Sequence, residues 1–224
     1  IADIASGAKN MVIGILAAYI KRQKTDNGDY IDISITDGIF AMSTFTTAAY
    51  LEGYPLPMPE TQILNGGSIY DYYMTADGRF LSVGPIEPKF FQSFCDAIGY
   101  NDMATTMDFS LETVQKHKRN IAVIIASKPL SYWIDVFSAL DACVEPVRTL
   151  DEAINNPPLY DRDMIVNVTT MNGKKLKQIA NPIKFSETKQ EYRSAGVRAG
   201  THTGDVLREL GYTDEEIAVF EREG

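Results

Sequence analysis

The sequence predicts an α/β fold, and three patterns near its start carry this prediction. Apolar residues recur at helical spacing between positions 11 and 20, so this segment should form a helix with one apolar face. Residues 30–35 alternate between apolar and polar, as a half-buried strand does, and Asp37-Gly38 should end it in a turn. A mixed apolar pattern resumes over residues 39–51. An order of helix, strand and helix indicates α/β organisation.

The first helix begins almost at the first residue, with Asp3 and Ser6 at its start. Lys21, Arg22 and Lys24 stand near its end, where cations complement the helix dipole. A natural N-terminus usually has a polar lead-in, and this chain begins without Met. We therefore expect it to be a fragment that begins inside a longer protein.

The middle of the chain predicts a hairpin and several helices. The proline-rich stretch 53–59 should be a connector, because it suits neither a helix nor a central strand. Residues 70–75 and 79–84 should pair around a tight Asp77-Gly78 turn. Helices are then expected from Pro88 to Gly99, over residues 110–126 and over residues 130–140.

The last third of the chain mixes short elements. We expect a short helix over residues 150–155 that Pro157-Pro158 breaks. A hairpin should follow, with strands 164–169 and 174–179 and its turn at Asn172-Gly173. Thr213 and Glu216 stand three apart ahead of an apolar run, which is a capping box, so the chain should close on helices.

Composition excludes several classes of function. The 224 residues, 45% of them hydrophobic, suffice for a real core, and a net charge of -9 argues against nucleic acid as a partner. No segment is long and apolar enough to cross a membrane, so we expect no membrane partner and a cytoplasmic location. Cys95 and Cys143 lack metal-ligand spacing, so no metal site is expected, and both should be buried, reduced thiols.

Five separated segments, in this order, resemble the class III CoA-transferase (CaiB/BaiF) superfamily. Each is weak alone, and their order is specific. The closest motifs are those of members like alpha-methylacyl-CoA racemase, and only the C-terminal part of such proteins is matched. The segments begin with Asp3-Ile4-Ala5-Ser6-Gly7, Tyr30, Asn65-Gly66-Gly67, Asp141 and Gly200, and the third runs on to Arg79.

The resemblance implies that Asp3 is the catalytic carboxylate. In the transferase branch such an aspartate forms covalent intermediates with the acyl group and CoA, and in the racemase branch it moves the proton alpha to the thioester. Glu87 matches a glutamate that orients a catalytic histidine in the racemase branch. The plainer interpretations are that Asp3 caps a helix with Ser6, and that Glu87 is only a carboxylate favoured at a helix N-terminus.

The resemblance also places Asn65, Gly66, Gly67 and Tyr70 near the thioester, although a turn leading into a hairpin would explain them as well. The catalytic histidine and most CoA-binding groups would lie upstream of Asp3, outside this sequence. His117 and His202 do not replace that histidine, and we interpret both as structural or solvated. This fragment alone is therefore expected to be inactive.

The fold that the resemblance implies is α/β, with an incomplete Rossmann-like large domain and a smaller α+β domain. Residues 1–65 and 185–224 would belong to the large domain and residues 66–184 to the small one. Full-length members would be interlocked homodimers that act on coenzyme A thioesters and hold no permanently bound cofactor. Racemase or epimerase chemistry is favoured; the alternatives are CoA transfer between carboxylic acids through an aspartyl-CoA thioester, and a catalytically incomplete fragment with a scaffold or binding role.

Overall fold

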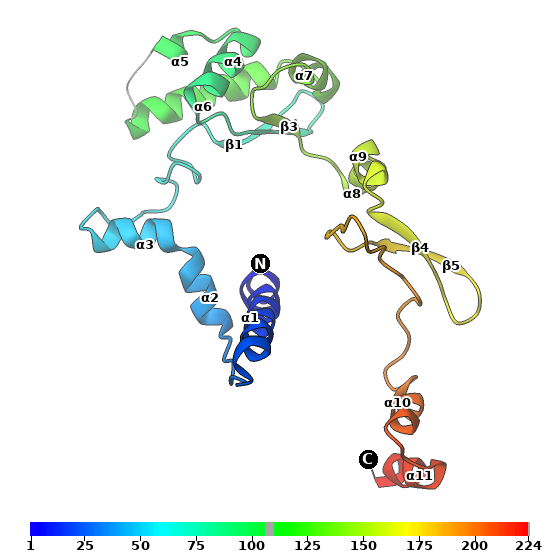
Figure 1. The fold of residues 1–224 in the computed structure, drawn as a ribbon. Helices are drawn as coiled ribbons and strands as arrows, with labels where there is room; N and C mark the ends of the chain where they lie inside the picture. Colours follow the sequence, from blue (N-terminus) through cyan, green and yellow to red (C-terminus); the bar gives the residue numbers. More distant parts are fainter. Residues whose placement is uncertain (106–109, 224) are drawn as a thin grey trace. The chain divides into compact units, whose positions relative to one another are not determined.

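The structure is a computed structural model that describes residues 1–105 and 110–223 (Figure 1). The chain forms two compact units, residues 1–147 and residues 148–224. Both units combine helices with antiparallel strands, so the predicted α/β class is confirmed. The large and small domains predicted from the sequence have other boundaries than these units, and they stay a prediction.

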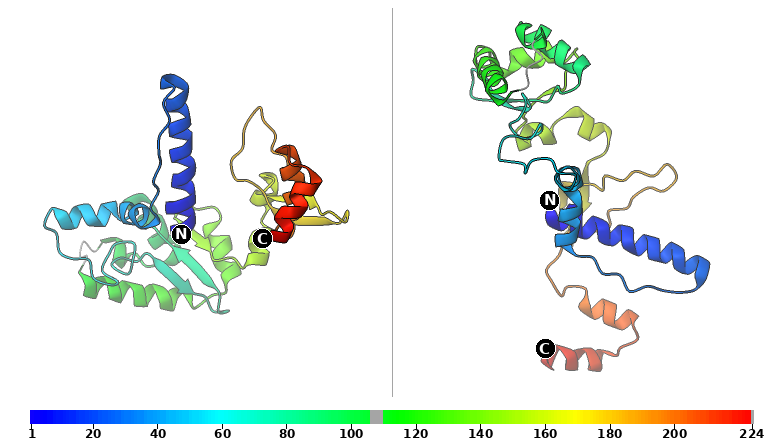
Figure 2. Two further views of the ribbon diagram at one scale, coloured as in Figure 1. Left: turned by 90° about the horizontal axis from the view of Figure 1, so that it is seen from below. Right: turned by 90° about the vertical axis from the view of Figure 1, so that its left-hand side faces the viewer.

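The first unit begins with four helical segments. A π-helix, η1 (Ala2–Ala8), runs directly into α1 (Lys9–Thr25), which is a single straight helix (Figure 2). The helices α2 (Ile35–Met42) and α3 (Thr44–Leu51) follow. The helices expected over residues 11–20 and 39–51 are therefore confirmed, the second one with an interruption at Ser43.

The strand expected over residues 30–35 is wrong. Residues 27–34 have no regular structure, and Ser34 caps α2 by accepting a hydrogen bond from the Asp37 N–H at 3.2 Å. Asp37 and Gly38 therefore lie inside a helix rather than in a turn. Alternating polarity distinguishes the two faces of a strand, but it does not show that a second strand lies beside it. No described residue forms a ladder of backbone hydrogen bonds with residues 30–35.

A three-stranded antiparallel sheet forms the centre of the next part of the unit. The predicted hairpin is confirmed: β1 (Asp71–Met74) pairs with β2 (Phe80–Val83), and Gly78 takes the left-handed φ of 72° that the turn requires. The strand β3 (Val144–Pro146) pairs with the other edge of β2 and was not expected. Its three residues are too few for an alternating pattern to be recognised.

Four helices accompany this sheet (Figure 1): α4 (Pro88–Ile98), α5 (Asp102–Thr105), α6 (Leu111–Ile125) and α7 (Leu130–Phe137). Pro88 opens α4 and Gly99 ends it with φ 68°, as expected. The side chain of Ser110 caps α6 by accepting from the Thr113 N–H at 3.3 Å. The helix expected over residues 130–140 is confirmed, although it ends at Phe137.

One hydrophobic core joins the sheet to α4, α6 and α7. Phe94 and Ile121 are fully buried in it, and the sheet contributes Tyr73, Leu81, Val83 and Val144. The indole N–H of Trp133 donates to the Ile125 carbonyl at 2.9 Å, which fixes α7 against the end of α6. Phe137 stacks on Phe94 with ring centroids 6.0 Å apart. The core residues lie between positions 69 and 144, so this stretch of chain packs upon itself.

The second unit holds a hairpin and four short helices. The hairpin strands β4 (Ile165–Thr169) and β5 (Lys175–Ile179) turn at Gly173, with φ 79°, as predicted (Figure 2). The predicted short helix is also present. Pro157 and Pro158 open a helix instead of only breaking one, because a first-turn proline loses no hydrogen bond. The helices are α8 (Leu150–Ile154), α9 (Pro157–Asp161), α10 (Thr203–Glu209) and α11 (Asp214–Glu223).

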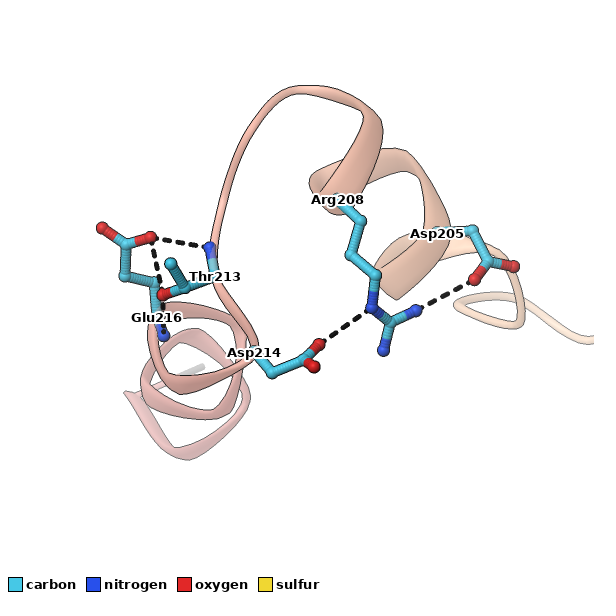
Figure 3. A network of polar contacts seen from close by, with 5 residues as sticks. All are labelled: Asp205, Arg208, Thr213, Asp214 and Glu216. Atoms are coloured by element: carbon cyan, nitrogen blue, oxygen red, sulfur yellow. Dashed lines mark hydrogen bonds and ion pairs between the residues drawn. The ribbon is translucent and has the colours of Figure 1, made fainter.

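Polar contacts tie α10 to α11 (Figure 3). The Arg208 guanidinium lies 3.0 Å from Asp205 and 2.8 Å from Asp214. The predicted capping box is confirmed, because the Thr213 N–H donates to the Glu216 carboxylate at 2.8 Å and the Glu216 N–H donates to the Thr213 hydroxyl at 3.3 Å. Among the described residues, no helix has both the length and the apolar character that crossing a bilayer requires.

Candidate functional site

Asp3 lies in η1, the π-helical segment at the start of the chain. A π-helix is rare, and short π segments inside helices are frequent at functional sites. The segment is held by Ser6, whose fully buried hydroxyl donates to the Ile35 carbonyl of α2 at 2.7 Å. Gly38 permits this approach, because a Cβ at that position would lie 2.0 Å from the Ser6 Oγ. A close contact between η1 and α2 therefore positions Asp3.

The side chain of Asp3 is exposed and does not cap the helix. The residue at the N-cap is Ile1, and no side-chain hydrogen bond caps η1. The interpretation that Asp3 and Ser6 together cap a helix is wrong for Ser6, since its hydroxyl is bonded to Ile35. The Asp3 carboxylate therefore has no such structural duty and stays a candidate for chemistry.

Glu87 occupies the N-cap position of α4 with an extended backbone, φ −71° and ψ 142°. Its carbonyl accepts the Phe91 N–H at 2.9 Å, but its carboxylate does not cap the helix. A carboxylate near a helix N-terminus is stabilised by the helix dipole. The position of Glu87 therefore also agrees with the plainer interpretation, in which it is only a carboxylate favoured at a helix N-terminus. The exposed carboxylate is nonetheless free of the capping role that would hold it against the backbone.

The surroundings of Glu87 are charged and include a cysteine. Lys89 forms an ion pair with Asp141 at 2.9 Å. Cys143, expected to be buried, is exposed, because its backbone adopts φ 50° where β3 begins. Partial desolvation and the negative charges of Glu87 and Asp141 raise the pKa of the Cys143 thiol. Cys95 is buried as expected, and its burial raises the pKa of its thiol to about 11.

The predicted thioester segment forms a tight loop in which both glycines are required by the fold. A Cβ on Gly66, with φ 85°, would lie 2.6 Å from the Glu60 Cβ, and one on Gly67 would lie 2.2 Å from the Thr61 carbonyl oxygen. The Gly67 N–H donates to the Gln62 carbonyl at 2.9 Å. The loop itself thus explains Gly66 and Gly67, and Asn65 is the member with an exposed polar side chain.

Tyr70 brings the loop and the Glu87 turn together. Its ring covers Gly84, where a Cβ would lie 2.9 Å from the Tyr70 Cε2. Beside this contact, a cavity of about 560 Å³ opens between Gly67-Ser68-Ile69 of the loop and Pro85, Ile86 and Pro88 around Glu87. Of the predicted site residues, Gly67 lines this cavity, and so do Ile86 and Pro88, the two sequence neighbours of Glu87. No hydrogen bond or ion pair among the described residues joins Asp3 to either segment.

The cavity also has lining residues that we had not expected. Phe91, Met103, Val114 and His117 come from three helices, and only His117 had been considered at all. His117 is buried rather than solvated: Asn120 donates to the Tyr100 hydroxyl at 2.7 Å, and that hydroxyl lies 2.9 Å from the His117 Nδ1. Helical periodicity marks Phe91 and Val114 as inward-facing, but it cannot tell a core position from a cavity wall.

In the described part of the chain, no three His, Cys, Asp or Glu residues gather closely enough to hold a metal ion.

Comparisons with known proteins agree on one family. The model of "CoA-transferase family III" matches residues 1–203. The chain is 27% identical to the alpha-methylacyl-CoA racemase of Homo sapiens over 218 residues and 31% identical to that of Mus musculus over 221 residues. Each match covers 97% of this chain and 56% of the relative, so the chain spans about half the length of these curated relatives.

The fold is also shared with solved structures. A CAIB/BAIF family protein from Brucella suis superposes with a TM-score of 0.68 at 19% identity, over 93% of this chain and 55% of that protein. At this level of identity the likeness concerns the fold. Together with the family match over residues 1–203, it shows that the chain belongs to CoA-transferase family III.

Proposed function

We propose that this chain belongs to an enzyme that removes and returns the proton alpha to the carbonyl of an acyl-CoA thioester, as a racemase or epimerase does. The observation that carries the proposal is the match to alpha-methylacyl-CoA racemases over 97% of the chain, with Asp3 and Glu87 both exposed. Because the chain spans only part of these relatives, the activity is assigned to the gene product that contains residues 1–224 and not to this segment alone.

Each candidate residue has a role in this chemistry. The Asp3 carboxylate would accept the alpha proton on one face of the substrate. A histidine outside residues 1–224 would return a proton on the opposite face, and Glu87 would orient it through a hydrogen bond. The enolate formed in between places negative charge on the thioester oxygen and requires a donor there. The side-chain amide of Asn65 supplies that donor, with the ring of Tyr70 as a wall.

Solvent deuterium tests the proposal. The gene product is incubated in D2O with a 2-methylacyl-CoA and no acceptor acid, and deuterium at the alpha carbon is followed by mass spectrometry. Asp3→Asn should slow incorporation by about 10²–10⁴-fold, the usual contribution of a positioned acid or base. Asp32→Asn, at another exposed carboxylate, is the matched control and should exchange at the original rate. Absence of exchange in the unsubstituted protein would refute the proposal.

Transfer of CoA between carboxylic acids is the second candidate, and the description of the matched family favours it. Here the Asp3 carboxylate would attack the acyl-CoA carbonyl and expel CoA as a thiolate. The thiolate would then attack the mixed anhydride at the aspartyl carbonyl and expel the donor acid as a carboxylate, leaving an aspartyl-CoA thioester. Hydroxylamine or borohydride would modify Asp3 in the presence of acyl-CoA. Trapping without alpha-deuterium in the recovered substrate would favour transfer, and deuterium without trapping would favour the racemase.

A homodimer, interlocked in the full-length protein, is the partner arrangement that we propose. It is supported by α1, none of whose residues is buried and seven of whose large apolar side chains are between 50 and 63% exposed. Apolar surface of this extent marks an interaction site. Leu16→Glu should lower the dimer fraction in analytical ultracentrifugation, whereas Lys24→Glu, on the same helix, should not. We also propose a cytoplasmic location and no permanently bound cofactor, the thioester being the substrate.

A further inference from the structure

The β4–β5 hairpin concentrates positive charge in an otherwise acidic chain. Residues 164–186, which include the hairpin, contain four lysines and no Asp or Glu, whereas the whole chain has a net charge of -9. Lys174, Lys175 and Lys177 are exposed, and within residues 1–105 and 110–223 none of their side chains forms an ion pair or a hydrogen bond. Lysines that have no acidic partner favour the binding of a negatively charged group.

One edge of β5 is open. In an antiparallel hairpin, alternate residues direct their N–H and C=O groups to the partner strand, and the residues between them direct theirs outward. The Thr170 N–H donates to the Lys174 carbonyl at 2.8 Å. The register then directs the backbone groups of Lys175, Lys177 and Ile179 away from β4. No described residue bonds to these outward groups, so this edge can accept a further strand.

The side chains of Lys175, Lys177 and Ile179 lie on one face of the hairpin, because alternate residues of a strand point to the same side. Ile179 is 76% exposed. Leu176 lies on the other face. A strand added beside β5 would therefore meet two positive charges and one apolar side chain. A lipid surface would meet only one large apolar side chain of β5 on this face, which favours a polypeptide over a membrane as the partner.

We propose that the outer edge of β5 binds an extended, acidic segment of a partner polypeptide by strand addition. In this mode of recognition, main-chain hydrogen bonds provide affinity and alternate side chains provide specificity. The proposal is independent of the racemase and transferase chemistry, because it uses no candidate catalytic residue. A second copy of β5 is a poor occupant, since antiparallel pairing about Lys177 would place two like charges opposite each other.

The geometry also specifies a sequence pattern for the partner. In antiparallel addition, every second partner residue lies opposite Ile179, Lys177 and Lys175, in that order. The complementary pattern is therefore an apolar residue and then two acidic residues, each separated from the next by one residue. A neutral strand would leave the charges of both lysines without partners, so the same lysines oppose non-specific pairing at this edge.

Binding of two matched peptides to the gene product tests the proposal. The probe is a capped synthetic peptide with the central sequence Val-Thr-Glu-Thr-Glu, and its control has lysine in place of both glutamates. Fluorescence anisotropy should show binding of the acidic peptide only, and added salt should weaken it. Lys177→Glu should weaken binding roughly threefold to tenfold, because an attractive cross-strand pair becomes repulsive. Lys189→Glu, at an exposed lysine outside the hairpin, should leave the affinity unchanged.

The backbone contacts need a measurement of their own. Ile179→Pro removes one outward N–H and keeps both lysines, so binding should weaken about twofold to tenfold, the usual net contribution of one hydrogen bond. Ile179→Thr keeps that N–H and should bind more tightly than Ile179→Pro. In the unsubstituted protein, the amides of Lys175, Lys177 and Ile179 should exchange more slowly with deuterium once the peptide is bound. This readout does not depend on whether a variant folds.

Slower exchange at these amides, together with the loss of affinity in Lys177→Glu, would support strand addition. The proposal is overturned if the acidic peptide does not bind, if the basic peptide binds equally well, if the amides of β5 exchange as before, or if Lys177→Glu and Lys189→Glu have equal affinities. Vesicles of phosphatidylserine and phosphatidylcholine are the alternative probe. Binding of these vesicles through Lys175 and Lys177, without binding of the acidic peptide, would make the hairpin a lipid-binding surface and refute the proposal.

Discussion

Two regions of the first unit differ in how their apolar residues are used. Between residues 69 and 144, the apolar side chains of a three-stranded sheet and its helices meet in one core, with Phe94 and Ile121 fully buried. In α1, by contrast, no residue is buried, although the helix carries Met, Val, Ile, Leu and Tyr along its length. The core region stabilises its own helices. Helix α1 is joined to η1, forms the exposed Lys21–Asp29 ion pair at 2.8 Å and lies against Ile31 and Ile33 at Gly14, but it buries no residue.

This difference matters for the site, because the two candidate carboxylates lie in the two regions. Glu87 begins a helix whose Phe94 and Ile98 are in the core, so its backbone is fixed by packing. Asp3 depends on the packing of η1 against α2, where Ser6 bonds to the Ile35 carbonyl and Gly7 and Gly38 allow close approach. Most of the stability of a helix in a protein comes from the packing of its apolar face, and α1 buries no residue. Placement of Asp3 for catalysis should therefore need a cover over α1, such as the dimer that we propose.

The largest effect should come from truncating a leucine in each region. Leu81→Ala, at a residue 1% exposed, should lower the free energy of unfolding by about 2–5 kcal/mol. Leu16→Ala, at a residue 55% exposed, should change it by less than about 0.5 kcal/mol in dilute, monomeric chain. Urea denaturation of both variants measures this. Equal losses would mean that α1 is packed as well as the core, and the comparison would fail.

A smaller effect is expected where η1 meets α2. Gly38→Ala places a Cβ 2.0 Å from the Ser6 Oγ, and overpacking of this kind costs about 1–3 kcal/mol, more than the helix propensity that alanine adds. Amide exchange within Ala2–Ala8 should accelerate in this variant. Gly28→Ala is the control, since nothing lies within 4 Å of its new Cβ. If exchange in η1 stays unchanged, the contact does not hold Asp3 in place.

Within the core region, an ion pair should contribute a little and only above acidic pH. Lys118 lies 2.6 Å from Asp71 and joins α6 to β1. Partial burial raises the pKa of Asp71, but the hydrogen bonds from Lys118 and the Tyr72 N–H, together with the charge of Lys118, outweigh burial and leave this pKa below its usual range. Because its pKa is lower in the folded state, Asp71 stabilises the fold at pH values above its unfolded-state pKa of about 3.9. This stabilisation is lost as the pH falls through the folded-state pKa.

Asp71→Asn should therefore lower stability by at most about 1 kcal/mol at neutral pH, because the pair is only partly buried and solvent still screens it. The difference from the unsubstituted chain should vanish in strongly acidic solution. Unfolding curves across pH measure it, and a difference that grows as pH falls would contradict the assigned sign.

The smallest effect concerns the neighbourhood of Glu87. Desolvation and then the charge of Glu87 raise the pKa of the exposed Cys143 thiol, so Glu87→Gln should lower that pKa and speed alkylation by iodoacetamide up to a few-fold, because only the thiolate reacts. Buried Cys95 should stay unreactive and serves as an internal reference. Glu112→Gln is the matched control. An unchanged rate at Cys143 would mean that Glu87 does not face it.

Local signals predicted the elements well where they were complete. Four of these signals are local motifs whose own residues determine the structure, and all four are present. They are the Asp77-Gly78 turn, the Asn172-Gly173 turn, the Pro88 start of α4 and the Thr213 capping box. Residues 30–35 failed because a strand depends on a neighbour that no alternating pattern specifies. The strand β3 was missed because its three residues carry no strand pattern of their own. Only their pairing with β2 makes them a strand.

The candidate site likewise has residues that the sequence predicted and residues that it did not. Asp3, Glu87 and the Asn65–Tyr70 segment could be named from family motifs, and among these site residues Gly67 lines the cavity. Met103, Val114 and His117 could not be named, because their part in the cavity follows from how α4, α5 and α6 pack. Cys143 was expected to be buried because free cysteines usually are, and a local φ of 50° turned it outwards.

Amide hydrogen exchange on the dilute chain tests the contrast between the two regions most directly. Amides of Leu81, Ile121 and Ile125 should open with a free energy close to that of global unfolding, whereas those of α1 should open with almost none. Raising the concentration of the gene product should protect α1 and leave the core amides as they were. Protection of α1 equal to that of Ile121 in dilute monomer would contradict the account.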